Sequence, residues 1–318
     1  MLQPLILLGP QRPNSNLPAV LEALDVQGPV VAITAGWRHD ESELGDLEAA
    51  VGKVQSLPLY RWFDRIPTEA PEIAATYKER QNRIKRFKDL YRLRVHSALS
   101  TVRELVRMLP NDPELVAPQI ERASEVVRGI DAEALAAVDE VRSAFKGLSA
   151  RFDVPWVRDR RDETAETIAN AGAVLIAGGH VAVLRNRMFF FGVEHALSAA
   201  LANNRPVIAW SAGAMVMTER IVLFYDDAPD GPAEAEVLDH GMGFAPGLVA
   251  FPHASERLRL DDVSRVAALA HRFGPMSCVG LHDGAWIQQT EAGWRNRGPS
   301  ESAVRMCPDG SHVPLEGM

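Results

Sequence analysis

Residues 207–214, Val-Ile-Ala-Trp-Ser-Ala-Gly-Ala, constrain the fold more than any other part of this chain. The first four suit a buried strand, and Ser211 then stands among small residues directly before a helical pattern. Such a junction is typical of a nucleophile elbow, a tight and strained turn that holds a hydroxyl above the edge of a parallel sheet. Small neighbours are needed because the turn brings backbones close together. A serine that merely caps the helix of an ordinary strand–helix unit would give the same local pattern.

Strand and helix patterns alternate on both sides of this junction, which favours a parallel sheet covered by helices. We therefore expect one α/β domain over residues 1–318, with a largely parallel central sheet flanked by helices. Helices are predicted at 17–24, 44–54 and 193–203, and strands at 5–8, 30–33, 57–62, 173–177, 207–210, 248–251 and 277–281.

Residues 67–150 show helical periodicity and almost no strand pattern, so they are predicted to be a helical insertion within that domain. One long helix is expected over about 71–108, ended by Leu109-Pro110-Asn111-Asp112-Pro113. A second is expected over 113–128 and a third over 131–148, with Asp131 as its N-cap.

The long helix of the insertion is strongly basic between residues 78 and 94. The favoured interpretation is a solvated face or the surface of a homodimer. A positive wall for an acidic substrate or a polyanion is the alternative. The basic residues are Lys78, Arg80, Arg83, Lys85, Arg86, Lys88, Arg92 and Arg94, against Glu79 and Asp89.

Composition excludes several classes of protein. The net charge of −8 argues against a dedicated nucleic-acid-binding protein. Two cysteines, Cys278 and Cys307, are too few for a disulfide framework and suit a reducing cytoplasm. The first ten residues lack a basic leader pattern and are predicted to form a first strand. No apolar run approaches the roughly 20 residues that a membrane span needs.

A serine nucleophile needs a base and an acid that orients the base. His253 is the strongest base candidate because it follows Pro252 at the end of the apolar segment 248–251, where active-site residues of α/β sheets gather. His240 and His282 are the competing candidates. Asp226 and Asp227, fifteen and sixteen residues beyond Ser211, are the natural acids.

These motifs together resemble peptidase family S51, which includes aspartyl dipeptidase and cyanophycinase. The resemblance rests on Gly178-Gly179, the Trp-Ser-Ala-Gly-Ala elbow, an acidic residue after it, and Pro252-His253, and covers about residues 170–290. It implies a class I glutamine amidotransferase-like fold. Amidotransferases of this fold carry a cysteine at the elbow, so Ser211 argues against glutaminase chemistry. Gly178-Gly179 also lacks the spacing of a dinucleotide site.

By this resemblance, Ser211 is the nucleophile, His253 the base, and Asp226 or Asp227 the acid, while the N–H groups of Gly179 and Ala212 form the oxyanion hole. The substrate pocket includes Gly178, His180, Met215 and His282; the last three depart from the family pattern. We expect a serine hydrolase that cleaves an amide bond of a small peptide without a cofactor or metal. The alternative is a non-catalytic family member that binds a small ligand or a protein partner.

Overall fold

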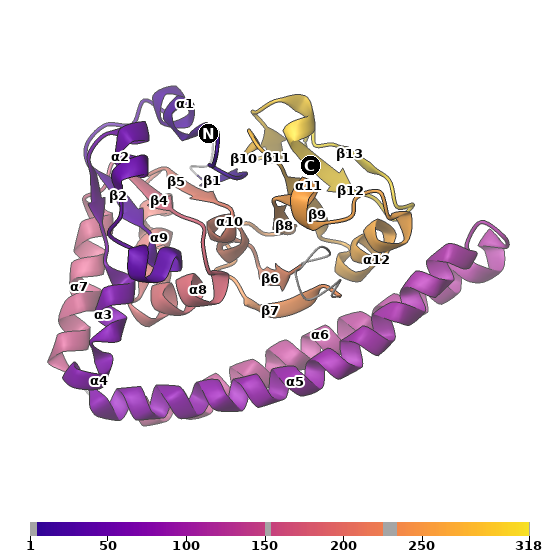
Figure 1. Cartoon of the computed structure of the whole chain (residues 1–318), viewed down its shortest axis with the longest axis horizontal. Helices are drawn as coiled ribbons and strands as arrows, with labels where there is room; N and C mark the ends of the chain where they lie inside the picture. Colours follow the sequence, from indigo (N-terminus) through magenta and orange to yellow (C-terminus); the bar gives the residue numbers. More distant parts are fainter. Residues whose placement is uncertain (1–4, 150–153, 225–233, 318) are drawn as a thin grey trace.

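The computed structural model describes residues 5–149, 154–224 and 234–317 of the chain (Figure 1). Its central sheet has seven strands in the order β11-β10-β1-β5-β4-β2-β3, and the last five of these are parallel. The predicted fold class, a largely parallel α/β sheet flanked by helices with a helical insertion, is confirmed. The strands are β1 (Leu5–Leu8), β2 (Val30–Ile33), β3 (Val54–Ser56), β4 (Ala173–Ile176), β5 (Val207–Trp210), β10 (Trp286–Thr290) and β11 (Gly293–Asn296).

Two smaller sheets complete the strand content of the described residues. β8 (Leu248–Pro252) and β9 (Ser277–Leu281) are parallel and continue into β12 (Ala303–Met306) and β13 (His312–Pro314). β6 (Arg220–Leu223) pairs with β7 (Glu236–His240). The strand that ends at Pro252 therefore lies in a different sheet from the strand that ends at the elbow.

Apolar side chains alternate along the central strands and cover both faces of the sheet. Ile6, Leu8 and Ile208 point to one face, where they pack against α1 (Leu17–Ala23) and α2 (Gly45–Val51). Leu5, Leu7 and Val207 point to the other face, into the main core. The remaining helices are α3 (Leu59–Asp64), α4 (Ile66–Glu69), α7 (Pro155–Ala169), α8 (Val181–Phe190), α9 (Val193–Ala202), α10 (Ala212–Met217), α11 (Ala254–Arg257) and α12 (Val263–Phe273), with short 3-10 turns at Ala35–Asp40 and Ser300–Ser302.

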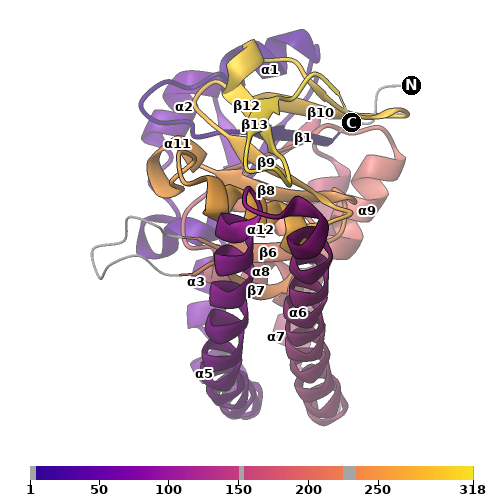
Figure 2. The ribbon, with the colours of Figure 1, turned by 90° about the vertical axis from the view of Figure 1, so that its right-hand side faces the viewer.

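The insertion is a long antiparallel hairpin of two helices, α5 (Pro71–Met108) and α6 (Pro113–Ser149). Its turn projects beyond the body in Figure 1, and Figure 2 shows the two helices side by side. The predicted break near residue 129 is wrong, because α6 is continuous through it. Asp131 caps no helix; it is fully buried and forms an ion pair with Arg272 of α12 at 2.7 Å. Among the described helices, none is both long enough and apolar enough to span a membrane.

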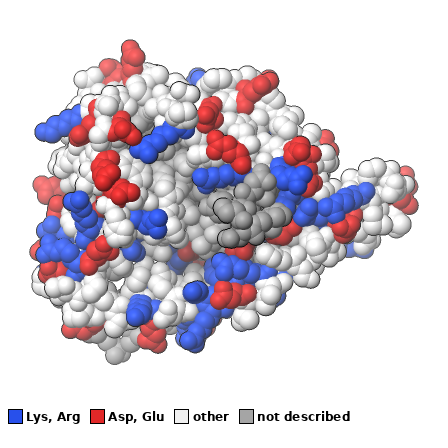
Figure 3. All heavy atoms as spheres, in the orientation of Figure 1, with Lys and Arg blue, Asp and Glu red and all other residues white. Residues whose placement is uncertain are grey.

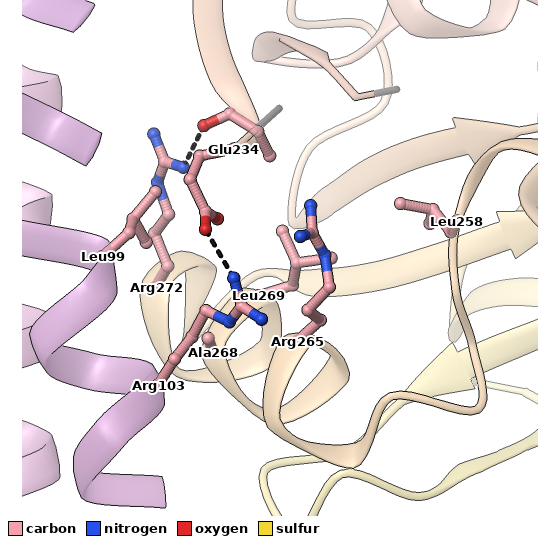
Figure 4. A pocket seen from close by; sticks show the side chains of 9 residues that line it. Leu99, Arg103, Glu234, Leu258, Arg265, Ala268, Leu269 and Arg272 are labelled. Carbon is pink, nitrogen blue, oxygen red and sulfur yellow. Dashed lines mark hydrogen bonds and ion pairs between the residues drawn. The ribbon is translucent and has the colours of Figure 1, made fainter. Parts of the chain in front are cut away.

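Part of the basic character of α5 serves to attach the hairpin to its own core. Lys88 Nζ donates to the carbonyl of Val237 at 2.8 Å, and Arg92 pairs with Glu236 at 2.8 Å. Arg103 points toward Glu234, 2.6 Å away, beside a void of only about 10 Å³ (Figure 4). Elsewhere Lys and Arg on the visible face are interspersed with Asp and Glu (Figure 3).

The predicted strand at 57–62 is also wrong, since these residues enter helix α3. Pro58 precedes the helix, and the buried carboxylate of Glu41 accepts hydrogen bonds from the N–H groups of Tyr60 and Arg61 at 2.8 and 3.0 Å. That carboxylate satisfies N-terminal donors that a helix leaves unpaired. The stabilising group lies some twenty residues away in sequence, so the local apolar pattern gave no sign of it.

Candidate active site

The elbow has the strained backbone that its sequence predicts. Ser211 adopts φ 52° and ψ −123°, a conformation that non-glycine residues rarely accept. A Cβ on Gly213 would lie 2.3 Å from the carbonyl oxygen of Ile176, and one on Gly178 would lie 2.8 Å from Cβ of Ser211. The small residues around Ser211 are therefore needed because β4 and its following turn lie against the elbow.

The hydroxyl of Ser211 meets the imidazole of His253. The distance from Oγ to Nε2 is 3.0 Å, although the two residues come from different sheets. His253 follows β8 with a left-handed backbone, φ 59°, and its N–H donates to the carbonyl of Leu281 at 2.9 Å. That hydrogen bond, together with Pro252, fixes where the ring lies. The serine and histidine predicted to act together are thus within hydrogen-bonding distance.

The environment of His253 favours a neutral imidazole. Burial lowers its pKa below the usual 6.5, and the nearby Arg257 lowers it further, while Glu256 and Asp283 act in the opposite direction. With Nε2 facing Ser211, Nδ1 faces the carboxylate of Glu256 at 3.4 Å. The ring can therefore accept a proton from Ser211 on Nε2 while the carboxylate of Glu256 lies near Nδ1.

The carboxylate in described contact with His253 is not one of the two aspartates predicted as the orienting acid. Asp226 and Asp227 lie outside the residues that the structure describes, so their positions stay predictions. Glu256, three residues after His253 on the single turn α11, is the carboxylate nearest the far ring nitrogen among the contacts described. Sequence reasoning missed it, and the three-residue helical spacing after His253 was the only signal.

Of the two residues predicted for the oxyanion hole, Ala212 follows Ser211 directly, and Gly179 follows Gly178, which packs against Ser211. Ala212 is the first residue of α10, where backbone N–H groups have no partner within the helix. Gly179 adopts φ 106°, and a Cβ there would lie 2.4 Å from the carbonyl oxygen of Gly36. Glycine is thus required in this turn, which packs beside the elbow through Gly178.

The residues predicted to line a substrate pocket have varied surroundings. His180 caps α8, its Nδ1 accepting the N–H of Val183 at 3.3 Å. His282 Nδ1 accepts the N–H of Ser255 at 3.2 Å and so supports the turn that follows His253. Met215 is buried in the main core. The competing base His240 pairs with Asp139 of α6 at 3.0 Å. In the described part of the chain, no cluster of three His, Cys, Asp or Glu side chains is arranged for a metal ion.

Comparison with known proteins gives one family. A model of peptidase family S51 matches residues 131–296, more than half of the chain. A crystal structure of a peptidase from an acI-B1 actinobacterium is similar at 12% identity, with 99% of this chain and 98% of that chain covered and a TM-score of 0.44. A putative peptidase E protein from Listeria monocytogenes EGD-e is similar at 12% identity over 44% of this chain and 65% of that chain, with a TM-score of 0.33. No curated protein matches the sequence.

Proposed function

The chain belongs to peptidase family S51, and from that premise we propose that it is a serine peptidase that hydrolyses an amide bond of a small peptide. The observation that carries the proposal is the 3.0 Å contact between Oγ of Ser211 and Nε2 of His253 at a strained elbow. A serine that only capped a helix would need neither a strained backbone with positive φ nor an imidazole at its hydroxyl.

In the proposed mechanism, Nε2 of His253 takes the proton of Ser211 as Oγ attacks the substrate carbonyl. The imidazolium then gives that proton to the departing amine, and water hydrolyses the acyl-enzyme with the same histidine as base. The N–H groups of Gly179 and Ala212 stabilise the oxyanion. Ala212 begins helix α10, where the N–H groups are already oriented before the charge forms. No cofactor takes part in these steps.

Three sets of carboxylates are candidates for the orienting acid: Glu256 by its contact, Asp283 by its electrostatic effect on His253, and Asp226 or Asp227 by sequence resemblance. We propose Glu256, since it is the one with a described contact to Nδ1. The amide variants Glu256→Gln, Asp283→Asn, Asp226→Asn and Asp227→Asn separate them. The true acid is the one whose amide lowers kcat far more than the others.

The decisive test of function compares Ser211→Ala with the parent on a library of dipeptides and tripeptides, with products measured by mass spectrometry. Hydrolysis by the parent and a loss of at least about a thousandfold in the variant are expected. Ser100→Ala, exposed on α5, is the matched control and should leave the rate unchanged. Equal turnover by Ser211→Ala would overturn the proposal. A parent that cleaves nothing would favour the non-catalytic alternative, in which the elbow only binds a ligand or partner.

We further propose that the hairpin forms a homodimer surface. Large apolar side chains on it are exposed, including Leu93 (73%) on α5 and Val126 (58%) on α6, and such exposure is typical of interaction sites when it is contiguous. Sedimentation should give about twice the 34.9 kDa chain mass for the parent and the single mass for Leu93→Glu. A parent that sediments as a monomer contradicts this.

Both cysteines are free, which is consistent with the cytoplasmic location expected from sequence.

A further inference from the structure

A cavity of about 850 Å³ lies between the hairpin and the α/β body, at the end of the hairpin remote from its turn. Its walls come from α5, α6, α7 and α8, with Glu194 of α9 and the end of β7. In Figure 1, α7 descends at the left toward the base of α5 and α6, and α8 lies on the side of the body that faces them. A volume of this size is typical of sites that enclose a small organic ligand.

The cavity is positively charged, although the chain as a whole carries a net charge of −8. Its lining includes two carboxylates, Asp139 and Glu194, against five guanidinium groups, from Arg80, Arg142, Arg158, Arg161 and Arg185. Asp139 lies 3.0 Å from Nε2 of His240 and 3.5 Å from Nη1 of Arg142. The lining therefore holds more cationic than anionic side chains.

The lining arginines differ in their described contacts. One buried carboxylate, Asp239, lies between Arg142 and Arg185, at 2.7 Å from Nη1 of Arg142. Arg161 donates Nε to the carbonyl of Phe190, a neutral acceptor, at 3.0 Å. Nε of Arg80 is buried with no hydrogen-bond partner among the described residues. Burial lowers the pKa of Arg185 to about 10, as expected where charge is held away from water.

Aromatic rings complete the lining and are already stacked with cations. The guanidinium of Arg80 lies 4.5 Å from the ring centre of Tyr77, and that of Arg185 lies 4.1 Å from the ring centre of Phe189. Phe145 and Phe190 also line the space. Planar guanidinium groups bind carboxylate or phosphate oxygens through paired hydrogen bonds, and the rings offer a surface for an apolar body.

The cavity is separate from the candidate active site. Neither Ser211 nor His253 is among its described lining residues, and neither are Gly179 and His282. Arg185 and Phe189, which line the cavity, lie in the body of α8. The glycine pair beside the elbow precedes His180, the N-cap at the start of the same helix, so α8 lies between the two sites in sequence.

We propose that this cavity is a binding site for an organic anion, one that carries a carboxylate or phosphate group on an aromatic body, distinct from the peptide site at Ser211. The oxygens of the anion accept hydrogen bonds from the guanidinium groups of Arg80 and Arg161, and its rings stack among Tyr77, Phe145, Phe189 and Phe190.

The test uses the fluorescent aromatic anion 8-anilinonaphthalene-1-sulfonate with the full chain. Saturable binding to one site per chain is expected, with displacement by 2-naphthoate or 2-naphthyl phosphate at concentrations at least tenfold lower than by the neutral 2-naphthamide. Which of the two anions displaces better tells carboxylate from phosphate. Displacement by the amide as effective as by both anions would overturn the proposal.

Substitutions of the lining arginines test whether the probe binds in this cavity. Arg80→Gln and Arg161→Gln should each weaken binding of the probe at least tenfold, whereas Arg83→Gln, exposed on the same helix as Arg80, should leave it within twofold. Ser211→Ala should bind the probe as the parent does, whether or not the chain proves to be a peptidase. Two lining variants that stay folded by circular dichroism and bind the probe as tightly as Arg83→Gln would contradict the assignment.

Discussion

At Ser211 a strained backbone and a close imidazole occur together. The turn that holds Ser211 requires a neighbouring residue without a side chain. Gly213 carries no side chain, and a methyl group there would meet the backbone of β4 at Ile176, which cannot move without disturbing the sheet. The elbow therefore requires glycine at position 213, directly after Ala212.

We expect Gly213→Ala to lower the free energy of unfolding by about 1–3 kcal/mol, the range for overpacking a filled site, and to abolish hydrolysis. Gly129→Ala is the matched control, because a Cβ there meets nothing within 4 Å and alanine favours a helix interior. It should gain up to about 1 kcal/mol. Urea unfolding measures both, and a Gly213→Ala variant as stable as the parent would contradict the close approach.

The pH dependence of hydrolysis should follow the ionisation of His253. Only the neutral imidazole can accept the proton of Ser211, so kcat/KM should be full above the pKa of His253 and fall as the pH drops through it. Because burial places that pKa below 6.5, the acid limb should have its midpoint below pH 6.5.

Neighbouring charges should move this limb in opposite directions. Glu256→Gln removes an anion that raises the pKa of His253, so the limb should shift to lower pH. Arg257→Gln removes a cation that lowers it, so the limb should shift to higher pH. Rate profiles measured from pH 4 to 8 give both midpoints. Shifts of the same sign would show that the limb reports another group.

The residues that carry the proposed chemistry were largely predictable from sequence, whereas their supports were not. A strand, a serine and small residues indicate an elbow because the turn allows few alternatives. The contact of His253 with Glu256 depends on one short helical turn, and the role of His282 in holding Ser255 depends on two segments that sequence separates by 27 residues.

At the scale of elements, a buried ion pair holds the hairpin to the body, and it includes Asp131, which the sequence predicts to be an N-cap. Asp131 of α6 and Arg272 of α12 are both buried, and the hydroxyl of Tyr91 on α5 donates to Asp131 at 2.8 Å. In sequence, Gly129 followed by Asp131 resembles a helix boundary, because glycine often follows the end of a helix and aspartate often caps the start of the next. Its partners lie 40 and 141 residues away, beyond any local pattern.

We expect Asp131→Ala to cost about 3–5 kcal/mol in the free energy of unfolding, because Arg272 would remain buried without its anion. The control is Glu133→Ala on the same helix, which breaks the exposed pair with Arg94 and should cost at most about 1 kcal/mol. Denaturant titration followed by circular dichroism compares the two. Similar, small losses in both would mean that the hairpin is held by its apolar contacts alone.

At the scale of the whole molecule, the sequence predicted the layers but not how the sheets meet. Alternating strands and helices indicate a parallel sheet because each strand must bury both faces. That β8 and β9 form a second sheet, which brings His253 to an elbow on the first, follows from contacts between distant segments. The cavity between the hairpin and the body arises in the same way, from four helices. Among its lining arginines, only Arg80 belongs to the basic segment 78–94 that the sequence singles out.

Covalent labelling of Ser211 tests the central claim, an activated serine paired with His253, most directly. A fluorophosphonate probe followed by mass spectrometry of the digested protein should place one label on Ser211, because only a hydroxyl that can lose its proton to a nearby base attacks phosphorus rapidly. In His253→Ala the labelling rate should fall at least a hundredfold. An unlabelled Ser211, or equal labelling with and without the imidazole, would contradict the account.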